Sequence, residues 1–487
     1  MKTYQINIDG EWINSITNKT FSSLNPFNEK IIGYFQSCNH EDVNKAVDAA
    51  EKAYSFWSNT PAPKRGELLL NAAVLLRKDK DRLAKLVVLE MGKVYKEAAG
   101  DVQEAIDIFE YMAGEGRRLF GVTTPSELKN KFCMTTRVPI GITGLITPWN
   151  FPIAIPAWKL SASLICGNTM IFKPSSDTPL CAIELIKILE KAGIPKGVVN
   201  LVTGRGEEVG NAIIRNKKIG MISFTGSRDT GEFILKNSGI KKIGLELGGK
   251  NPIIIMDDAD LNLALEGVLW GAFGTSGQRC TAASRVIIHK KVKDKFEKML
   301  LNKVKKLKLG NGLDKKTDIG PLINKKALEK VHNYTQIGVK EGAKLLCGGK
   351  ILNAKGYFYM PTIFTNVTKG MRIAQEEIFG PSLAIIEVND LNEAIEVCNS
   401  VKYGLSSSIY TNNINNAFKA IKEIEAGLVY INSSTIGSEV HLPFGGVKET
   451  GNGTREGGIT GIEEFSEIKT IYIDYSRKLQ KAQIDTN

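Results

Sequence analysis

The chain has 487 residues, of which 43% are hydrophobic and 24% are charged. This length exceeds a single ordinary core, and the apolar content excludes a disordered protein, so two or more globular domains are expected. No apolar run approaches the ~20 residues that cross a bilayer, and residues 1–12 lack the apolar stretch of a secretory signal. We therefore predict neither a membrane segment nor a membrane partner.

Lysine and arginine outnumber aspartate and glutamate by 64 to 52, a formal net charge of +12. The lysines follow amphipathic helical patterns such as residues 291–308, without interleaved aromatic residues, so no nucleic-acid partner is expected. The seven cysteines include no CxxC pair, which favours reduced thiols and a cytoplasmic location. The four histidines stand neither near one another nor near a cysteine at metal-ligand spacing, so no metal site is predicted.

Three long helices are predicted first, over residues 41–54, 64–93 and 97–119. Strand-like and helix-like segments then alternate between residues 137 and 240. The predicted strands are 141–148, 168–174, 198–204 and 221–227, and the predicted helices are 156–166, 180–193 and two that begin at residues 207 and 228. This rhythm is typical of a parallel sheet covered by helices and indicates a nucleotide-binding domain.

A second α/β block follows, from about residue 251 to about residue 446. Two β-prone segments, 120–138 and 467–475, have no sheet of their own to join. They are expected to extend away from the body as two strands that pair with each other or with another subunit.

Three short motifs suggest chemistry. In GTSGQRCTA (274–282), Cys280 follows a glycine-rich approach whose backbone N–H groups could stabilise an oxyanion, although it could equally be a small buried residue. In LELGGKNP (245–252), Glu246 beside two glycines could activate water as a base, or could be a solvated residue at a strand end. In ITPWNFP (146–152), Asn150 is a neutral donor suited to an oxyanion, or a turn residue beside a core tryptophan.

Phosphate-binding segments also follow predicted strands. VTGRGEEVG (202–210) spaces its glycines one residue wider than the usual dinucleotide fingerprint and is a weak signal alone. FTGS (224–227) stands before a helix and offers N–H groups and the positive end of a dipole. IFKPSSDTP (171–179) places Lys173 at the end of a neighbouring strand.

Taken in order, Asn150, Lys173, FTGS, Glu246 and Cys280 resemble the aldehyde dehydrogenase superfamily, as do EEIFGP (376–381) and PFGGVKETG (443–451). Within it the chain looks most like the α-ketoglutaric semialdehyde (2,5-dioxopentanoate) dehydrogenases, through YMAGEGRR (111–118), WNFPIAIPAWK (149–159) and TSGQRCTAASRV (275–286).

The resemblance implies an α/β fold of three parts and a homo-oligomer, with a dimer of dimers expected. The parts are a Rossmann-like nucleotide-binding domain (1–119 and 139–249), an α/β catalytic domain (250–466) and a β oligomerisation arm (120–138 and 467–487).

The resemblance also implies an NAD(P)-dependent oxidation. Cys280 would attack the aldehyde, with the oxyanion held by the Asn150 amide and the Cys280 N–H. A thioester would follow hydride transfer, and Glu246 would then activate water, with Lys159 tuning proton movement. The cofactor residues implied are Thr147, Pro148, Trp149, Lys173, Ser176, Gly206, Phe224, Gly226, Ser227, Leu247, Glu377 and Phe379.

Two departures from relatives bear on specificity. Many NAD-preferring relatives have a glutamate where this chain has Ser176, and since a carboxylate there would repel a 2′-phosphate, NADP is the preferred cofactor, with NAD as the alternative. Succinate-semialdehyde dehydrogenases typically have an arginine where this chain has Trp158. Arg279, next to the nucleophile, is the candidate anchor for a carboxylated substrate such as 2,5-dioxopentanoate, with Arg118 and Arg117 as secondary candidates.

Several alternatives remain open at this point. Arg279 could instead pair with a nearby acid. The substrate could be another small aldehyde, such as succinate semialdehyde, glyceraldehyde or lactaldehyde. The chain could also be a CoA-acylating or a non-enzymatic family member, although CoA-acylating relatives usually lack the deacylating glutamate that Glu246 represents.

Overall fold

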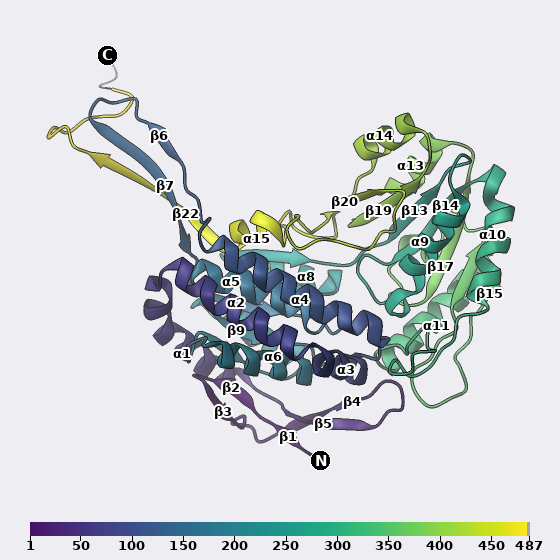
Figure 1. The fold of residues 1–487 in the computed structure, drawn as a ribbon, viewed down its shortest axis with the longest axis horizontal. Coiled ribbons are helices and arrows are strands. Elements are labelled where there is room, and N and C mark those ends of the chain that lie inside the picture. The colour runs from purple at the N-terminus through teal and green to yellow at the C-terminus, as the bar shows by residue number, and fades with distance from the viewer. Residues whose placement is uncertain (485–487) are drawn as a thin grey trace.

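A computed structural model describes residues 1–484 of the chain. Figure 1 shows two bodies of sheet and helix side by side and a thin arm that projects from one of them. No helix of the described part is long and apolar enough to cross a membrane.

The first body is built on a seven-stranded sheet in the order β12-β11-β8-β9-β10-β2-β3. The first five strands in that order run parallel, and β2 and β3 are antiparallel at one edge. All residues of the central strands β8, β9 and β10 are buried, as expected for a sheet covered by helices on both faces. The strands are β2 (Ile6–Ile8), β3 (Glu11–Ile13), β8 (Ile142–Ile146), β9 (Thr169–Lys173), β10 (Val199–Leu201), β11 (Ile219–Thr225) and β12 (Lys242–Glu246).

Eight α-helices accompany this sheet and confirm the predicted βα alternation. They are α1 (His40–Asn59), α2 (Ala62–Lys78), α3 (Lys80–Met91), α4 (Tyr95–Glu115), α5 (Ala154–Cys166), α6 (Pro179–Ala192), α7 (Asn211–Arg215) and α8 (Arg228–Asn237). The π-helical turn η1 (Gly206–Gly210) precedes α7. A small sheet of β1 (Thr3–Tyr4), β4 (Thr20–Leu24) and β5 (Ile31–Gln36) lies at the N-terminal end.

The single helix predicted over 64–93 is wrong, because the structure has two helices there. Asp79 leaves helical geometry (φ −103°, ψ 9°) and ends α2 while it starts α3. Its carboxylate accepts hydrogen bonds from the Arg82 guanidinium one turn later. Aspartate side chains favour helix ends over helix interiors, which explains the break.

The second body is built on another seven-stranded sheet, in the order β15-β16-β17-β14-β13-β19-β20, parallel except for β15. The strands are β13 (Asn251–Ile255), β14 (Ala283–His289), β15 (Lys344–Cys347), β16 (Thr362–Thr365), β17 (Ser382–Val388), β19 (Ser406–Tyr410) and β20 (Leu428–Ile431). The helices are α9 (Leu261–Phe273), α10 (Lys290–Val304), α11 (Lys325–Lys340), α12 (Arg372–Gln375), α13 (Leu391–Asn399) and α14 (Ile414–Glu423).

The last part of the chain returns from the second body to the first. The short strands β18 (Tyr403–Gly404) and β21 (Val447–Lys448) pair with each other, and α15 (Gly458–Glu464) packs against α5. This return brings residues 444–464 next to the first sheet.

The arm consists of β6 (Thr123–Pro125), β7 (Lys131–Pro139) and β22 (Ser466–Asp474). β22 pairs with β7 in antiparallel register from Ser466↔Pro139 to Asp474↔Lys131, and Figure 1 shows the pair extending away from the body. The prediction that these two segments pair with each other is confirmed. Residues 485–487 of the predicted arm lie outside the described residues.

The register of the parallel strands explains why several predicted site residues lie at the same edge of the sheet. Phe224 of β11 is level with Ile146 of β8, and Thr225 is level with Glu246 of β12. The three strands therefore end together, at the edge where parallel sheets bind ligands. From Glu246 a four-residue link leads into β13 of the second body, so this edge faces the start of the second sheet.

Candidate active site

The loop before Cys280 has an unusual backbone. Within the 3₁₀ turn η2 (Gly274–Gly277), Thr275 and Ser276 adopt φ values of 52° and 57°, in the left-handed region that such residues rarely occupy. The Glu97 carboxylate of α4 accepts a hydrogen bond from the Thr275 N–H (2.8 Å), and the Ser276 hydroxyl donates to the Gly320 carbonyl (2.7 Å). Surrounding contacts thus hold a strained turn, which is common at functional sites.

Amide side chains hold the residues around Cys280. Asn251 Nδ2 donates to the Cys280 carbonyl (2.7 Å), and the Gln278 Oε1 accepts from the Ile323 N–H (2.9 Å). Asn150 Nδ2 donates to the Gln278 carbonyl at 3.1 Å. Because Nδ2 carries two hydrogens, one remains for a ligand. The structure thus brings Asn150 to the Cys280 loop, as its predicted role requires.

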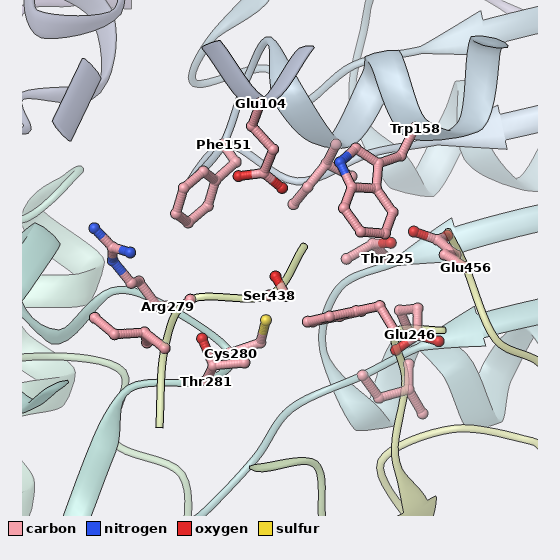
Figure 2. Close-up of a pocket in the computed structure, with 15 residues that line it drawn as sticks. Glu104, Phe151, Trp158, Thr225, Glu246, Arg279, Cys280, Thr281, Ser438 and Glu456 are labelled. Atoms are coloured by element: carbon pink, nitrogen blue, oxygen red, sulfur yellow. The ribbon is translucent and has the colours of Figure 1, made fainter. Parts of the chain in front are cut away.

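We call the hollow above Cys280 the inner cavity (Figure 2). It is lined by Glu104, Phe151, Ile155, Trp158, Thr225, Glu246, Leu247, Arg279, Cys280, Thr281, Ile436, Gly437, Ser438, Phe444 and Glu456. Trp158 and Phe444 pack edge to face, with ring centroids 5.7 Å apart. The walls are largely apolar, and the charged groups are acidic except for Arg279, which suits a small organic ligand.

A second hollow, the outer cavity, lies on the other side of the nucleophile. It is lined by Pro148, Trp149, Asn150, Ile155, Thr225, Gly226, Ser227, Leu247, Gly248, Cys280, Ile323, Asn324, Lys326, Ala327, Lys330, Glu377, Ile378 and Phe379. Cys280, Ile155, Thr225 and Leu247 line both cavities. The thiol therefore stands at the junction of two binding spaces.

The outer cavity contains most of the predicted cofactor residues. Pro148, Trp149, Gly226, Ser227, Leu247, Glu377 and Phe379 line it. The Glu377 carboxylate accepts a hydrogen bond from the Gly249 N–H (3.0 Å), and a Cβ added at Gly248 would lie 2.5 Å from that carboxylate. A larger residue at position 248 would therefore displace the Glu377 carboxylate.

The other predicted cofactor residues do not line this cavity. Phe224 and Thr147 are buried. Ser176 and Gly206 form a separate group with Lys173: the Ser176 hydroxyl donates to the Gly204 carbonyl (2.8 Å), next to the turn that contains Gly206. Burial lowers the pKa of the Lys173 ammonium to about 8, and Glu207 lies close enough to oppose that change.

Glu246, the last residue of β12, is only 4% exposed, and neither of its carboxylate oxygens has a hydrogen-bond partner. Burial and then the neighbouring Glu456 carboxylate raise its pKa well above the usual range, while Lys159 opposes them. This shift favours the neutral form of the Glu246 carboxyl group, because an unpaired buried carboxylate is unfavourable.

Lys159 belongs to a buried network of polar groups beside Glu246. Its Nζ donates to the Glu456 carboxylate and to the Ser223 hydroxyl (2.9 Å), and Ser223 Oγ donates to Glu464 (3.2 Å). Burial raises the pKa of Glu464 to about 8. The network thus joins two carboxyl groups and one ammonium group beside Glu246.

The Cys280 thiol is neutral in this arrangement. Burial, followed by the negative charges of Glu246 and Glu377, raises its pKa to about 12. Because the thiolate is the nucleophile, a base or a nearby positive charge has to assist its formation. All seven cysteines are free in the structure, and Cys280 is the one among them that lines the inner and outer cavities.

Two of the three candidate substrate residues, Trp158 and Arg279, line the inner cavity. The Arg279 guanidinium stacks on Phe151 and Trp270, at 5.2 and 4.8 Å from the ring centroids. Its Nε donates to Thr275 Oγ1 (2.8 Å), and NH2 lies 3.8 Å from Glu97. It therefore both holds the Cys280 loop and presents a positive charge to the cavity.

Arg118 is not brought to the inner cavity, contrary to expectation. Its guanidinium pairs with Glu115 at 2.6 Å, and its side chain is 49% exposed. Arg117 is exposed as well. Both follow the last turn of α4, where the chain turns away from the cavity toward the arm.

Sequence reasoning missed Glu104, Glu456 and Glu464. No sequence feature indicated a functional role for Glu104, which stands within a predicted helix. Lys159 offered an indirect one, because a lysine in the apolar segment 149–166 needs a buried counter-charge. The counter-ion Glu456 stands 297 positions away and could not be found from spacing. Among residues 1–484 no group of three or more histidine, cysteine or acidic residues could hold a metal ion.

Comparison with known proteins agrees with this geometry. The sequence matches the aldehyde dehydrogenase family over residues 12–471. It is 42% identical over 478 residues to an α-ketoglutaric semialdehyde dehydrogenase of Bacillus subtilis, covering 97% of this chain and 98% of that one. It is 40% identical to a 2,5-dioxopentanoate dehydrogenase of Saccharolobus solfataricus, covering 97% of this chain and 99% of that one.

The fold is also similar to solved structures. A betaine aldehyde dehydrogenase from Staphylococcus aureus, crystallised in complex with NAD⁺, superposes with a TM-score of 0.96 at 36% identity, covering 98% of this chain and 96% of that one. The chain belongs to the aldehyde dehydrogenase family and is an oxidoreductase. The resemblance and the α/β fold predicted from its motifs are confirmed.

Proposed function

We propose that the enzyme oxidises a carboxylated semialdehyde such as 2,5-dioxopentanoate to its carboxylic acid, with NADP in preference to NAD. The observation that carries this proposal is the position of Cys280 between two cavities, the inner one of which contains a single cationic side chain, Arg279. The names of the Bacillus and Saccharolobus relatives support the same substrate class.

The outer cavity fits a nicotinamide dinucleotide. Gly226 and Ser227 precede α8, and Ser227 caps that helix by accepting from the Thr230 N–H (3.4 Å), so free N–H groups at the helix start suit a pyrophosphate. Glu377, with Gly248 kept small beside it, would hold a ribose. A nicotinamide bound there supplies a hydride acceptor for the carbon attached to Cys280.

The protein's own steps begin at Cys280. The thiol loses its proton, and Sγ forms a bond with the aldehyde carbon to give a thiohemiacetal. Its oxyanion accepts hydrogen bonds from Asn150 Nδ2 and the Cys280 N–H. Loss of a hydride from this carbon leaves a thioester.

The second half regenerates the thiol. Glu246, once ionised, takes a proton from water as the water oxygen attacks the thioester carbon. The C–S bond then breaks, the carboxylic acid leaves and Cys280 recovers a proton. Glu456 and Lys159 adjoin Glu246 and provide a path for the proton that it has taken.

Three features favour this function over its alternatives. Trp158 fills the position of the arginine typical of succinate-semialdehyde dehydrogenases, which leaves Arg279 as the anchor for a carboxylate. Glu246 argues against a CoA-acylating enzyme, because hydrolysis needs a base. The intact set of Cys280, Asn150 and Glu246 argues against a non-enzymatic role.

Rates with an aldehyde panel and both cofactors test the substrate. We expect 2,5-dioxopentanoate to exceed neutral aldehydes of equal length in kcat/KM, and Cys280→Ala to oxidise none of them. Arg279→Gln should lower kcat/KM for the carboxylated substrate. The loss should correspond to about 1.5–3 kcal/mol of transition-state stabilisation, the scale of a hydrogen bond to a charged group. An equal loss for neutral aldehydes would mean that Arg279 only supports the Cys280 loop.

We further propose a homo-oligomer, with a dimer of dimers expected, that works in the cytoplasm. The exposed apolar side chains of the arm support the first part, since Ile468 and Tyr472 of β22 are 64% and 66% exposed in the single chain. The seven free cysteines suit a reducing compartment.

A further inference from the structure

Glu104 is an acidic residue in the wall of the inner cavity that the steps above do not use. It lies on α4 and is half-buried. Figure 2 shows its carboxylate directed into the cavity between Phe151 and Trp158, on the side opposite Cys280. A substrate whose aldehyde carbon meets Cys280 would therefore bring its distal end toward this wall.

The charged neighbours of Glu104 are committed to other partners. Asp101, one turn earlier on α4, pairs with Lys93 (3.1 Å) and accepts from the Ala154 N–H (2.7 Å). Arg279, from the Cys280 loop, is bound to Thr275 and lies beside Glu97. Glu104 itself forms no ion pair within residues 1–484, so its charge is available to a ligand.

These surroundings shift the pKa of the Glu104 carboxyl group to near-neutral pH. Burial and then the Asp101 carboxylate raise its pKa to about 7, against the opposing cations Arg279 and Lys93. Across the cavity stand further acidic groups, Glu246 and Glu456. At lower pH Glu104 is a neutral O–H donor, and at higher pH it becomes an anion among other anions.

We propose that Glu104 selects substrates by charge: its neutral form admits an aldehyde with a distal carboxylate, and its ionised form excludes it. Arg279 then attracts the distal carboxylate of the substrate, and the protonation state of Glu104 determines the pH range in which this attraction is effective. This inference rests on the proposed role of the inner cavity as the aldehyde site. The ionisation of Glu104 should not affect kcat/KM for neutral aldehydes, and it should raise kcat/KM for cationic aldehydes.

The test is a pH series of relative specificities, from pH 6 to pH 9. The probes are succinate semialdehyde, butanal and 4-trimethylammoniobutanal, whose charges do not change in this interval. The chemical steps at Cys280 and Glu246 are common to the three aldehydes, so their pH dependence cancels in a ratio of kcat/KM values, and the Glu104 variants separate the charge of Glu104 from that of the other acidic groups in the cavity. The ratio of succinate semialdehyde to butanal should fall by about 10-fold as pH rises, the scale of one charge at close range.

Glu104→Gln should remove this fall, because glutamine stays neutral and keeps a donor. Glu104→Asp should retain it, since aspartate still titrates. The matched control is Glu110→Gln on the same helix, whose carboxylate pairs with Arg77 (2.7 Å) away from the cavity and which should leave the ratio as in the parent. Unfolding temperatures of all variants identify any that are misfolded, and ratios are compared among folded proteins.

A pH-dependent ratio that survives in a folded Glu104→Gln protein would overturn the inference, as would a flat ratio in the parent enzyme. These outcomes are distinguishable from failure of the proposed function. If butanal exceeds succinate semialdehyde and 2,5-dioxopentanoate at every pH but the ratio still depends on Glu104, the substrate proposal fails and the charge selection stands.

Discussion

At the scale of single residues, Glu246 combines a buried carboxyl group with the absence of any hydrogen-bond partner for its oxygens. Its pKa lies well above the usual range because of burial and Glu456, so its basic form is gained as pH rises. Steady-state turnover should therefore decrease as pH falls through that pKa. Glu246→Gln should lower steady-state turnover by about 10²–10⁴-fold, the range for loss of a general base.

Stopped-flow measurement of reduced cofactor separates the two steps that Glu246 could serve. A burst equal to one turnover should survive in Glu246→Gln, because hydride loss precedes deacylation. Loss of the burst would mean that Glu246 also activates the thiol, and near-normal turnover would remove it from the mechanism.

Ser176 is the residue on which cofactor choice should depend. Its hydroxyl donates to the Gly204 carbonyl, and Lys173 lies on the preceding strand β9. Ser176→Glu places a carboxylate where a 2′-phosphate is expected, so KM for NADP should rise by about 10-fold or more while KM for NAD stays equal or falls. Initial rates at varied cofactor concentration measure this.

Ser175→Glu is the control for Ser176→Glu, because it adds the same charge one position earlier, where the hydroxyl bonds to Asp177 instead. Ser175→Glu should change KM for NADP and KM for NAD by the same factor. If Ser176→Glu also changes NADP and NAD alike, that position does not contact the ribose and the NADP preference is refuted.

At the scale of elements, the turn η2 determines where Cys280 stands. Gly277 has φ +69°, and an added Cβ would lie 2.3 Å from the Gly380 carbonyl oxygen. Because that oxygen belongs to the backbone, Gly277→Ala must displace the turn. It should lower the free energy of unfolding by about 1–3 kcal/mol and reduce kcat further than stability alone explains.

Thermal unfolding and initial rates check this, with Gly100→Ala as the control. Gly100 is exposed on α4 and has no atom within 4 Å of an added Cβ. Alanine there should keep activity and add about 0.5–1 kcal/mol of stability, because it favours the helix. A Gly277→Ala enzyme with the parent's stability and rate would contradict the packing described for η2.

At the scale of the whole molecule, the arm is exposed in a single chain. Deletion of residues 467–487 removes β22 and leaves the edge of β7 without its partner strand. We expect smaller or aggregated species in analytical ultracentrifugation, because an unpaired edge promotes non-native association. Ile468→Lys with Tyr472→Lys keeps the backbone and should yield smaller species without aggregation. Unchanged assembly in both variants would exclude the arm as the interface.

The element pattern was accessible from the sequence because it is a local property. Apolar runs bounded by turn residues predicted β8, β9 and β11, and the helix predicted over 180–193 ends there, with Gly193 as its cap in the left-handed conformation that glycine adopts easily. The break at Asp79 was missed because the apolar periodicity continues through it, whereas the break depends on one polar side chain.

The positions of Cys280, Glu246 and Asn150 were predictable because each stands in a motif at the end or start of a strand, and parallel strands bring such ends together. The surroundings of these residues were not. Lys159 meets Glu456 only because the chain returns from the second body to pack on α5, and Arg118 misses the cavity because α4 ends before it.

The sequence by itself therefore determined the family, the alternation of strands and helices, and the candidates for nucleophile, base and oxyanion donor. Only the tertiary structure decided which charges surround them. Glu104 faces the cavity because of how α4 is rotated against α5, and rotation about a helix axis is set by packing and not by local periodicity. The charged residues around the inner cavity come from distant segments of the chain, and burial shifts the pKa values of Glu104 and Glu246 upward.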